Sequence, residues 1–135
     1  MSDRHPKGLL DTSVVIDLDL LDAALLPVAA AISAITLAEL AAGPHAAGDL
    51  AERAARQDRL QRVESTFDPL PFDEHAARAY GLLYAAVIAA GRKARGPRAL
   101  DLEIAAVARA NGLPLYTRNP KDLRGIEHLV EIIAV

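Results

Sequence analysis

Cysteine and tryptophan are absent from this chain of 135 residues, and aromatic residues make up only 4% of it. Without cysteine there is no disulfide framework, no thiolate metal site and no cysteine nucleophile. Hydrophobic residues make up 52%, mostly Ala, Leu, Val and Ile, and this composition excludes wholesale disorder. The length suits one ordinary domain, and no repeat, low-complexity tract or linker interrupts it. We therefore expect a single domain over residues 1–135.

Long apolar runs are also missing. Residues 1–7 lack the apolar core of a signal peptide, and we expect them to form a flexible N-terminal extension. The longest uncharged run, residues 23–38, contains Pro27 and is shorter than the roughly 20 residues of a membrane span. These absences predict a soluble, cytoplasmic protein with no membrane association. The net charge of −3 also argues against a sequence-general binder of duplex DNA, which is usually basic.

Short apolar segments alternate with amphipathic ones along the chain. The expected strands cover residues 8–10, 30–35, 113–117 and 129–135, with a possible edge strand at 67–72. The expected helices cover residues 12–21, 37–43, 50–64, 73–90 and 99–110, and Gly43-Pro44 is expected to stop the second of them. Strands that alternate with helices predict an α/β fold, an open parallel sheet with helices on both faces.

Four acidic residues are expected at one edge of this sheet, where ligands bind beyond the carboxyl ends of parallel strands. Asp11 ends the first strand, Glu39 follows the second by one helical turn, and Asp122 follows Thr117 at the end of a later strand. Asp101 begins a helix that turns back into the next strand, so the start of this helix lies at the same edge. Glu39 stands out further, because no other residue from 23 to 48 carries a formal charge.

Each acid also has a purely structural explanation. Thr36 and Glu39 fit a capping box, Asp11 fits an N-cap, and Asp101 suits the dipole of a first helical turn. Caps alone do not explain why all four acids reach one edge. Clustered carboxylates repel one another unless a positive charge lies among them, and oxygen-only ligands favour Mg²⁺ or Mn²⁺. The four histidines are scattered and show no ligand spacing.

Four segments carry a family resemblance in their order and spacing: "LLDTSVVI", "ITLAELAAG", "ALDLEIAAVA" and "LYTRNPKDL". Together they resemble the signature segments of PIN-domain ribonucleases, and most of all the VapC toxins of bacterial toxin–antitoxin pairs. The resemblance spans residues 8–126. It implies a three-layer α/β/α sandwich with a central parallel sheet, and endonucleolytic cleavage of RNA that depends on Mg²⁺ or Mn²⁺.

The same resemblance implies roles for individual residues. Asp11 and Asp101 match the metal ligands, and Glu39 would hold the metal through water or act as general base. The fourth acidic position is open, because Asn119 stands where many PIN domains have an acid and Asp122 follows one turn later. The catalytic set is Asp11, Glu39, Asp101 and Asp122, and the polar positions matched to metal-bound water or substrate are Thr12, Ser13, Thr117 and Asn119.

A basic segment lies just before Asp101. Two interpretations remain for it, contact with RNA phosphates or a solvated loop. The glycines at 91 and 96 have the spacing of a phosphate-binding loop, but Pro97-Arg98 replaces the Lys-Ser/Thr pair that such a loop requires. The candidate substrate-binding residues are Arg92, Lys93, Arg95 and Arg98.

The resemblance also implies partners: a VapB-like antitoxin that blocks the nuclease, and a homodimer. The apolar segments 18–26 and 35–42 are expected to form a helix pair that offers the surface for such contacts. Two other functions remain as alternatives. One is a catalytically silent PIN-like scaffold that binds proteins. The other is a metal-dependent phosphotransfer domain, although such domains need paired acids after the first strand, and here Thr12-Ser13 follows Asp11.

Overall fold

A computed structural model describes residues 4–135. One sheet of four strands lies at its centre, in the order β2-β1-β3-β4, and every neighbouring pair is parallel. The carboxyl ends of all the strands therefore meet at one edge, as the sequence predicts. The strands are β1 (Lys7–Leu10), β2 (Ala29–Ala31), β3 (Leu115–Thr117) and β4 (Ile132–Ala134).

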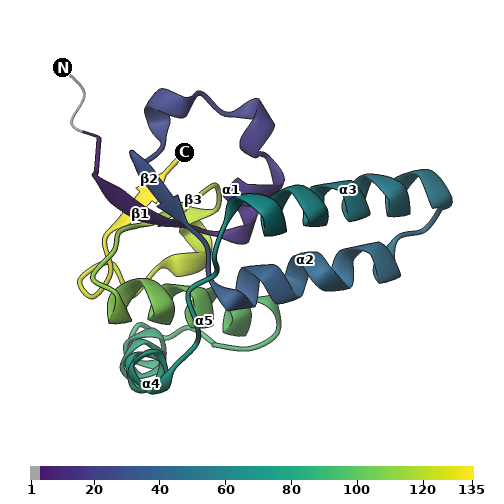
Figure 1. Cartoon of the computed structure of the whole chain (residues 1–135). Helices are drawn as coiled ribbons and strands as arrows, with labels where there is room; N and C mark the ends of the chain where they lie inside the picture. Colours follow the sequence, from purple (N-terminus) through teal and green to yellow (C-terminus); the bar gives the residue numbers. More distant parts are fainter. Residues whose placement is uncertain (1–3) are drawn as a thin grey trace.

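Helices cover both faces of the sheet and give the predicted three-layer α/β/α sandwich (Figure 1). In Figure 1, α2 and α3 form a hairpin that projects from the body of the molecule, while α4 and α5 lie together on the other side. The helices are α1 (Thr12–Ile16), α2 (Ala34–Ala46), α3 (Leu50–Thr66), α4 (Glu74–Ala89) and α5 (Pro97–Ala110), with three 3-10 helices, η1 (Leu18–Leu20), η2 (Ala23–Leu25) and η3 (Pro120–Leu123).

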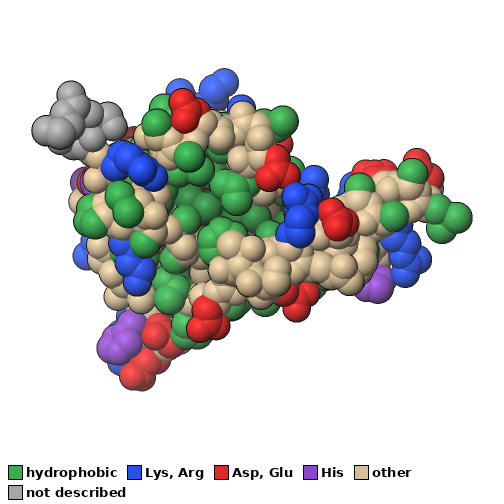
Figure 2. Space-filling view, turned by 45° about the horizontal axis from the view of Figure 1, so that its top comes forward, with side chains coloured by type: hydrophobic (Ala, Val, Ile, Leu, Met, Phe, Trp, Pro, Cys, Tyr) green, Lys and Arg blue, Asp and Glu red, His purple; other side chains and the backbone are tan. Residues whose placement is uncertain are grey.

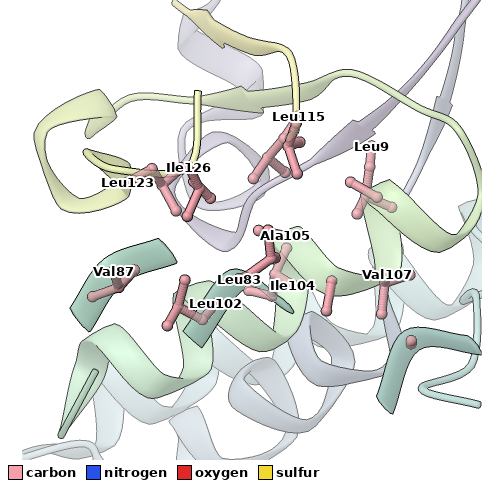
Figure 3. Packing of buried hydrophobic residues seen from close by; sticks show 14 residues of the cluster. Leu9, Leu83, Val87, Leu102, Ile104, Ala105, Val107, Leu115, Leu123 and Ile126 are labelled. Carbon is pink, nitrogen blue, oxygen red and sulfur yellow. The ribbon is translucent and has the colours of Figure 1, made fainter. Parts of the chain in front are cut away.

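Each central strand contributes to two hydrophobic cores, because successive side chains of a strand point to opposite faces. Leu9 and Leu115 pack against α4 and α5, and Figure 3 shows them facing Ala105 and Ile104 of α5. Leu10 and the other neighbours on that face pack against α1, α2 and α3. The strands β1 and β3 are thus buried on both faces, which explains their nearly continuous apolar sequence.

Several predicted boundaries are wrong, and most of these lie near β2. The second strand ends at Ala31, and α2 begins at Ala34 because the Ser33 side chain accepts a hydrogen bond from the backbone N–H of Thr36. Pro44 does not stop this helix, which continues to Ala46. A proline near the last turn removes only one backbone hydrogen bond, and its φ suits a helix.

The first predicted helix is also too long. It ends at Ile16, and the segment after it forms the single turns η1 and η2 rather than a partner for α2. The helix pair expected from segments 18–26 and 35–42 is therefore wrong, and α2 packs against α3 instead. Residues 67–72 form no strand, although Leu70 makes an isolated bridge with Ser33.

The flexible extension expected at residues 1–7 is wrong for residues 4–7, and residues 1–3 lie outside the described part of the chain. Arg4 Nε donates to the carbonyl of Leu26 at 3.0 Å, and His5 pairs with Glu131 at 2.9 Å. Lys7 belongs to β1. No helix within residues 4–135 has the length and apolar character needed to cross a bilayer.

Candidate active site

Asp11 lies at the centre of the carboxyl edge of the sheet, directly after β1, and its side chain is only 5% exposed. Its Oδ1 accepts from the backbone N–H of Thr12 at 2.8 Å, so the predicted N-cap is confirmed. Its Oδ2 accepts from Ser13 Oγ at 2.9 Å and from Thr117 Oγ1 at 2.8 Å. Three donors therefore fix both oxygens of this carboxylate in place.

Glu39 is held by a chain of hydroxyl groups that begins at the N-cap of α2. Thr12 Oγ1 donates to Glu39 Oε1 at 2.8 Å and lies 3.0 Å from Thr36 Oγ1. Ser33 Oγ lies 3.4 Å from Thr36 Oγ1. An ionised carboxylate only accepts, so the single proton of Thr12 points to Glu39, and Thr36 must then donate to Thr12. The chain has one direction, from Ser33 through Thr36 and Thr12 to Glu39.

This arrangement replaces the capping box expected from Thr36 and Glu39. Ser33 caps α2, so Thr36 already lies inside the helix and its hydroxyl is free to reach Thr12. The role of Thr36 in orienting Glu39 was missed. A signal was present in the sequence, because Thr36 and Glu39 are three residues apart and share one helical face.

Asp101 lies on α5 with no such support, and its charge is strongly disfavoured. Burial, and then the negative charges of Asp11, Asp122 and Glu39, raise the pKa of Asp101 to about 7, while Arg98 opposes the shift. The other three predicted acids therefore lie within electrostatic reach of Asp101. The structure thus brings together the residues that the sequence predicted would converge.

Burial also raises the pKa of Glu39 above its ordinary value. The hydrogen bond from Thr12 opposes this shift and the charge of Asp11 adds to it. A carboxylate with a raised pKa is a better proton acceptor than one in water. Two acids of the set therefore combine burial with unrelieved negative charge, which is the electrostatic condition that a bound cation would relieve.

The donor chemistry of the site fits a hard divalent cation, since every acidic donor is a carboxylate oxygen. Within residues 4–135, no three Asp, Glu or His side chains lie close enough together to hold an ion as they stand. A site with fewer carboxylate ligands suits Mg²⁺, which usually keeps several waters and uses one or two carboxylates of the protein. Asp11 is fixed in place by three hydrogen bonds and is the best ordered of the candidate ligands.

The basic segment before α5 divides into two parts. Arg92 Nη1 donates to the carbonyl of Lys121 at 2.9 Å, and this bond joins the segment to η3, which carries Asp122. The other three basic residues line a hollow of about 490 Å³ together with two of the acids: Lys93, Arg95, Arg98, Asp101 and Asp122. Gly96 adopts a φ of 62° and ends the segment where α5 begins.

Asn119 lies two residues beyond the end of β3. Its backbone N–H donates to Thr117 Oγ1 at 3.0 Å, and its exposed side chain makes no hydrogen bond within residues 4–135. Asp122, by contrast, acts on the charge of Asp101. Asp122 therefore carries a charge that acts on the set, and the choice between Asn119 and Asp122 for the fourth position stays a prediction.

A second hollow, of about 430 Å³, opens beside Glu39 and Thr12 and extends along α3 to Arg56 and Arg59. It adjoins a third hollow of about 220 Å³ between α1 and α3. The lining of the third hollow is part apolar and part polar, the polar part being Asp19, Arg59, Arg62 and Thr66. Figure 2 shows hydrophobic side chains gathered between α3 and the segment of the 3-10 helices, edged by charged groups. The apolar lining of the third hollow consists of Val15, Ile16, Leu18, Val63 and Phe67.

Comparison with known proteins gives one consistent result. Residues 9–128 match the family model of the PIN domain. Over the full length of both proteins, the chain is 39% identical to Ribonuclease VapC5 of Mycobacterium tuberculosis (strain ATCC 25618 / H37Rv).

Solved structures agree with this match. A crystal structure of VapBC-5 from M. tuberculosis, a member of the VapBC family of toxin-antitoxin systems, aligns with a TM-score of 0.81 and 38% identity. That alignment covers 96% of this chain and 99% of the other. VapBC2 from Rickettsia felis, bound to a DNA fragment from its promoter, aligns with a TM-score of 0.74 and 25% identity over 93% of this chain and 98% of the other.

Proposed function

Because this chain belongs to the PIN domain family, and within it resembles a VapC ribonuclease over its full length, we propose that it is an endoribonuclease toxin. We further propose that its reaction depends on Mg²⁺ or Mn²⁺. The observation that carries the proposal is the convergence of Asp11, Glu39, Asp101 and Asp122 at the carboxyl edge of the sheet. Four neighbouring carboxylates with so little opposing charge form a costly arrangement for a purely structural role.

The division of labour among the acids follows from their surroundings. Asp11 and Asp101 would hold the ion. Hydrogen bonds already fix Asp11 in place, and the raised pKa of Asp101 means that a nearby cation would stabilise its charged form. When bound, the ion would activate water and stabilise charge at the scissile phosphate. Glu39, aimed by Thr12, is the candidate general base that accepts a proton from the attacking water. Asp122 would add a further negative charge beside Asp101.

The two alternative functions have less support. A silent scaffold has no need for a hydroxyl chain that holds the carboxylate of Glu39 in place. A phosphotransfer domain of the receiver kind needs a second acid beside the first strand, and the residues there, Thr12 and Ser13, donate hydrogen bonds to acids instead. Neither alternative accounts for the match to a ribonuclease over the whole chain.

A toxin of this kind needs a protein that restrains it, and the VapBC structures that align with this chain are toxin–antitoxin complexes. We propose a VapB-like antitoxin as the partner, and the hollow between α1 and α3 as part of its docking surface. We propose a cytoplasmic location, because the proposed RNA substrate and antitoxin would both be found there. We also propose a homodimer, with the outer side of α4, where Leu82, Tyr84 and Ile88 are exposed, as a candidate surface that sedimentation would test.

The function is tested by RNA cleavage with the purified protein in Mn²⁺ and in EDTA. We expect cleavage in Mn²⁺, none in EDTA, and loss of cleavage in Glu39→Gln. Asp68→Asn is the matched control, because Asp68 is exposed and makes no side-chain hydrogen bond within residues 4–135. Equal cleavage by Glu39→Gln and Asp68→Asn, or full cleavage in EDTA, would overturn the proposal.

A further inference from the structure

The acids of the active site lie between two hollows, and each hollow contains a different part of the acidic set. Glu39 lines the hollow along α3, whereas Asp101 and Asp122 line the hollow beside the 92–98 segment. The two hollows are linked through the acids, because α2, which carries Glu39, contacts α5, which carries Asp101, and the charges of Glu39 and Asp122 both act on Asp101. Arginine side chains line both hollows together with these acids.

On the α3 side, four arginines recur at intervals of three residues, and the structure separates their roles. Arg56 donates to the carbonyl of Gly43 at 2.9 Å and pairs with Glu52, so it joins α3 to α2. Arg62 pairs with Asp19 at 2.9 Å and with Asp58 at 3.2 Å. The remaining two are Arg53, which is exposed, and Arg59.

Arg59 combines three features that the other arginines of α3 do not share. Its side chain is half-buried, it makes no ion pair or side-chain hydrogen bond within residues 4–135, and it lines the hollow that contains Glu39. A guanidinium group always carries its charge and matches phosphate oxygens with two parallel donors. Arg59 is therefore available to hold a phosphate beside the general base.

In the other hollow, Lys93, Arg95 and Arg98 belong to the lining, while Arg92 donates to the carbonyl of Lys121. We infer that a single strand of RNA passes from the Arg59 side of α3, across the acids, to the hollow of Lys93, Arg95 and Arg98. This inference rests on the proposed function and deepens it, because it assigns the path of the substrate. Cations on both sides offset the repulsion between the acids and the phosphate that is cleaved.

The path has a consequence for substrate choice. A strand held on both sides of the acids must extend in both directions from the cleaved bond, so bonds near either end of an RNA are poor substrates. A single strand suits the site better than a duplex, since the cations lie in two local groups and the chain as a whole has a net charge of −3.

The first experiment measures RNA binding without cleavage. The probe is a fluorescein-labelled single-stranded RNA of mixed sequence, in EDTA, with fluorescence anisotropy read over a series of salt concentrations. We expect Arg59→Gln and Arg98→Gln each to weaken binding several-fold and to lower the salt slope by about 0.7, the value for one lost phosphate contact on a single strand.

There are two controls, one on α3 like Arg59 and the other at the end of η3. Arg53→Gln removes the same charge from α3, and Arg124→Gln removes it just after η3, yet neither residue lines either hollow. Both controls should lower the salt slope by less than half as much. Equal effects of Arg59→Gln and Arg53→Gln would overturn the path, whether or not the wild-type protein cleaves RNA. The path survives, and the proposed function fails, if the binding pattern holds while no RNA is cleaved in Mn²⁺.

The second experiment tests direction. Cleavage is first mapped on one RNA, which is then shortened on the 5′ side or on the 3′ side of the cleaved bond. We expect the defect of Arg59→Gln to disappear on one shortened RNA and the defect of Arg98→Gln to disappear on the other. Disappearance of both defects on the same shortened RNA would place both arginines on one side of the bond and overturn the path.

Discussion

The two halves of the acidic site differ in how their carboxylates are held. Asp11 and Glu39 receive hydrogen bonds from the hydroxyls of Thr12, Ser13 and Thr117. Asp101 and Asp122 make no side-chain hydrogen bond within residues 4–135, and burial together with neighbouring charge raises the pKa of Asp101 to about 7. The first half is built at the ends of strands and the start of α2, and the second lies on α5 and η3.

This difference indicates that the site is only partly preorganised. The hydroxyl-supported half already fixes the proposed metal ligand Asp11 and the proposed proton acceptor Glu39, so little ordering would remain to be done there. The other half carries the raised pKa of Asp101 and would supply most of the attraction for the proposed cation. A site of this kind would bind its ion more tightly as the pH rises, because protons compete for Asp101. Each of the following substitutions tests one side of the comparison.

Asp11→Asn should have the largest effect. RNA cleavage in Mn²⁺ should fall by more than about a hundredfold, because the fixed ligand loses its charge. The fold should survive, since the amide oxygen can still accept from Thr12 N–H and the hydroxyls of Ser13 and Thr117 can turn to accept from the amide. Cleavage rates and circular dichroism melts in EDTA measure the two effects. Retained cleavage would remove Asp11 from the mechanism.

Asp101→Asn should stabilise the metal-free protein at high pH. Between pH 3.8 and about 7, the folded chain keeps a proton on Asp101 that the unfolded chain has released. The contribution of Asp101 to the free energy of unfolding is therefore fully present at low pH and is lost as the pH rises to about 7.

Asp101→Asn does not lose this contribution. Its free energy of unfolding should therefore exceed that of the wild type by about 1 to 2 kcal/mol at pH 8, after allowance for solvent screening, and should equal it near pH 4. Urea denaturation in EDTA at both pH values gives the comparison. Glu103→Gln on the same helix is the control. A variant that is no more stable than wild type at pH 8 would mean that Asp101 carries little unrelieved charge.

Thr12→Val breaks the chain that aims Glu39 while keeping the shape of the side chain. We expect about a tenfold loss of cleavage, in the range found for groups that orient a catalytic ligand. Thr12→Ser keeps the hydroxyl and should retain most of the activity. Thr36→Val should lose less activity than Thr12→Val, because the Thr36 hydroxyl is hydrogen-bonded to Thr12 and not to Glu39. Cleavage rates of the three variants, with melts in EDTA as a check of folding, decide the matter. Equal rates for the Val and Ser variants would show that the hydroxyl does not position Glu39.

Arg92→Gln should have the smallest effect. It removes the bond that joins the basic segment to η3, worth about 0.5 to 1 kcal/mol, and so loosens Asp122. Mn²⁺ affinity measured by calorimetry should fall about two- to fivefold, with an unchanged salt slope of RNA binding. Arg124→Gln is the matched control. A reduced salt slope in Arg92→Gln would return Arg92 to the group of phosphate contacts.

The parallel α/β architecture follows from local patterns in the sequence, and so does the placement of the acids. Asp11 comes directly after a fully apolar strand, and the short turn at Asn111-Gly112 reverses the chain between α5 and β3, which carries Asp101 to the active edge. The start of α2 was predicted wrongly because Ser33 and Thr36 are both good N-caps. Competition between two such residues is decided by the packing of the chain that enters the helix, here the bridge from Ser33 to Leu70.

The sequence by itself determined the layer arrangement, the shared edge of the strand ends and the four acids that gather there, because these depend on periodicity and on short connections. Tertiary structure alone decided how the acids are held. The bond from Thr117 to Asp11 joins residues 106 positions apart, and Thr36 meets Thr12 across 24 positions. These pairs exist because β1 lies between β2 and β3 in the sheet, and that order brings hydroxyls from three strand ends around Asp11 and Glu39. Tertiary structure likewise decided that Arg56 and Arg92 have backbone partners on other segments, whereas Arg59 has no side-chain partner among residues 4–135.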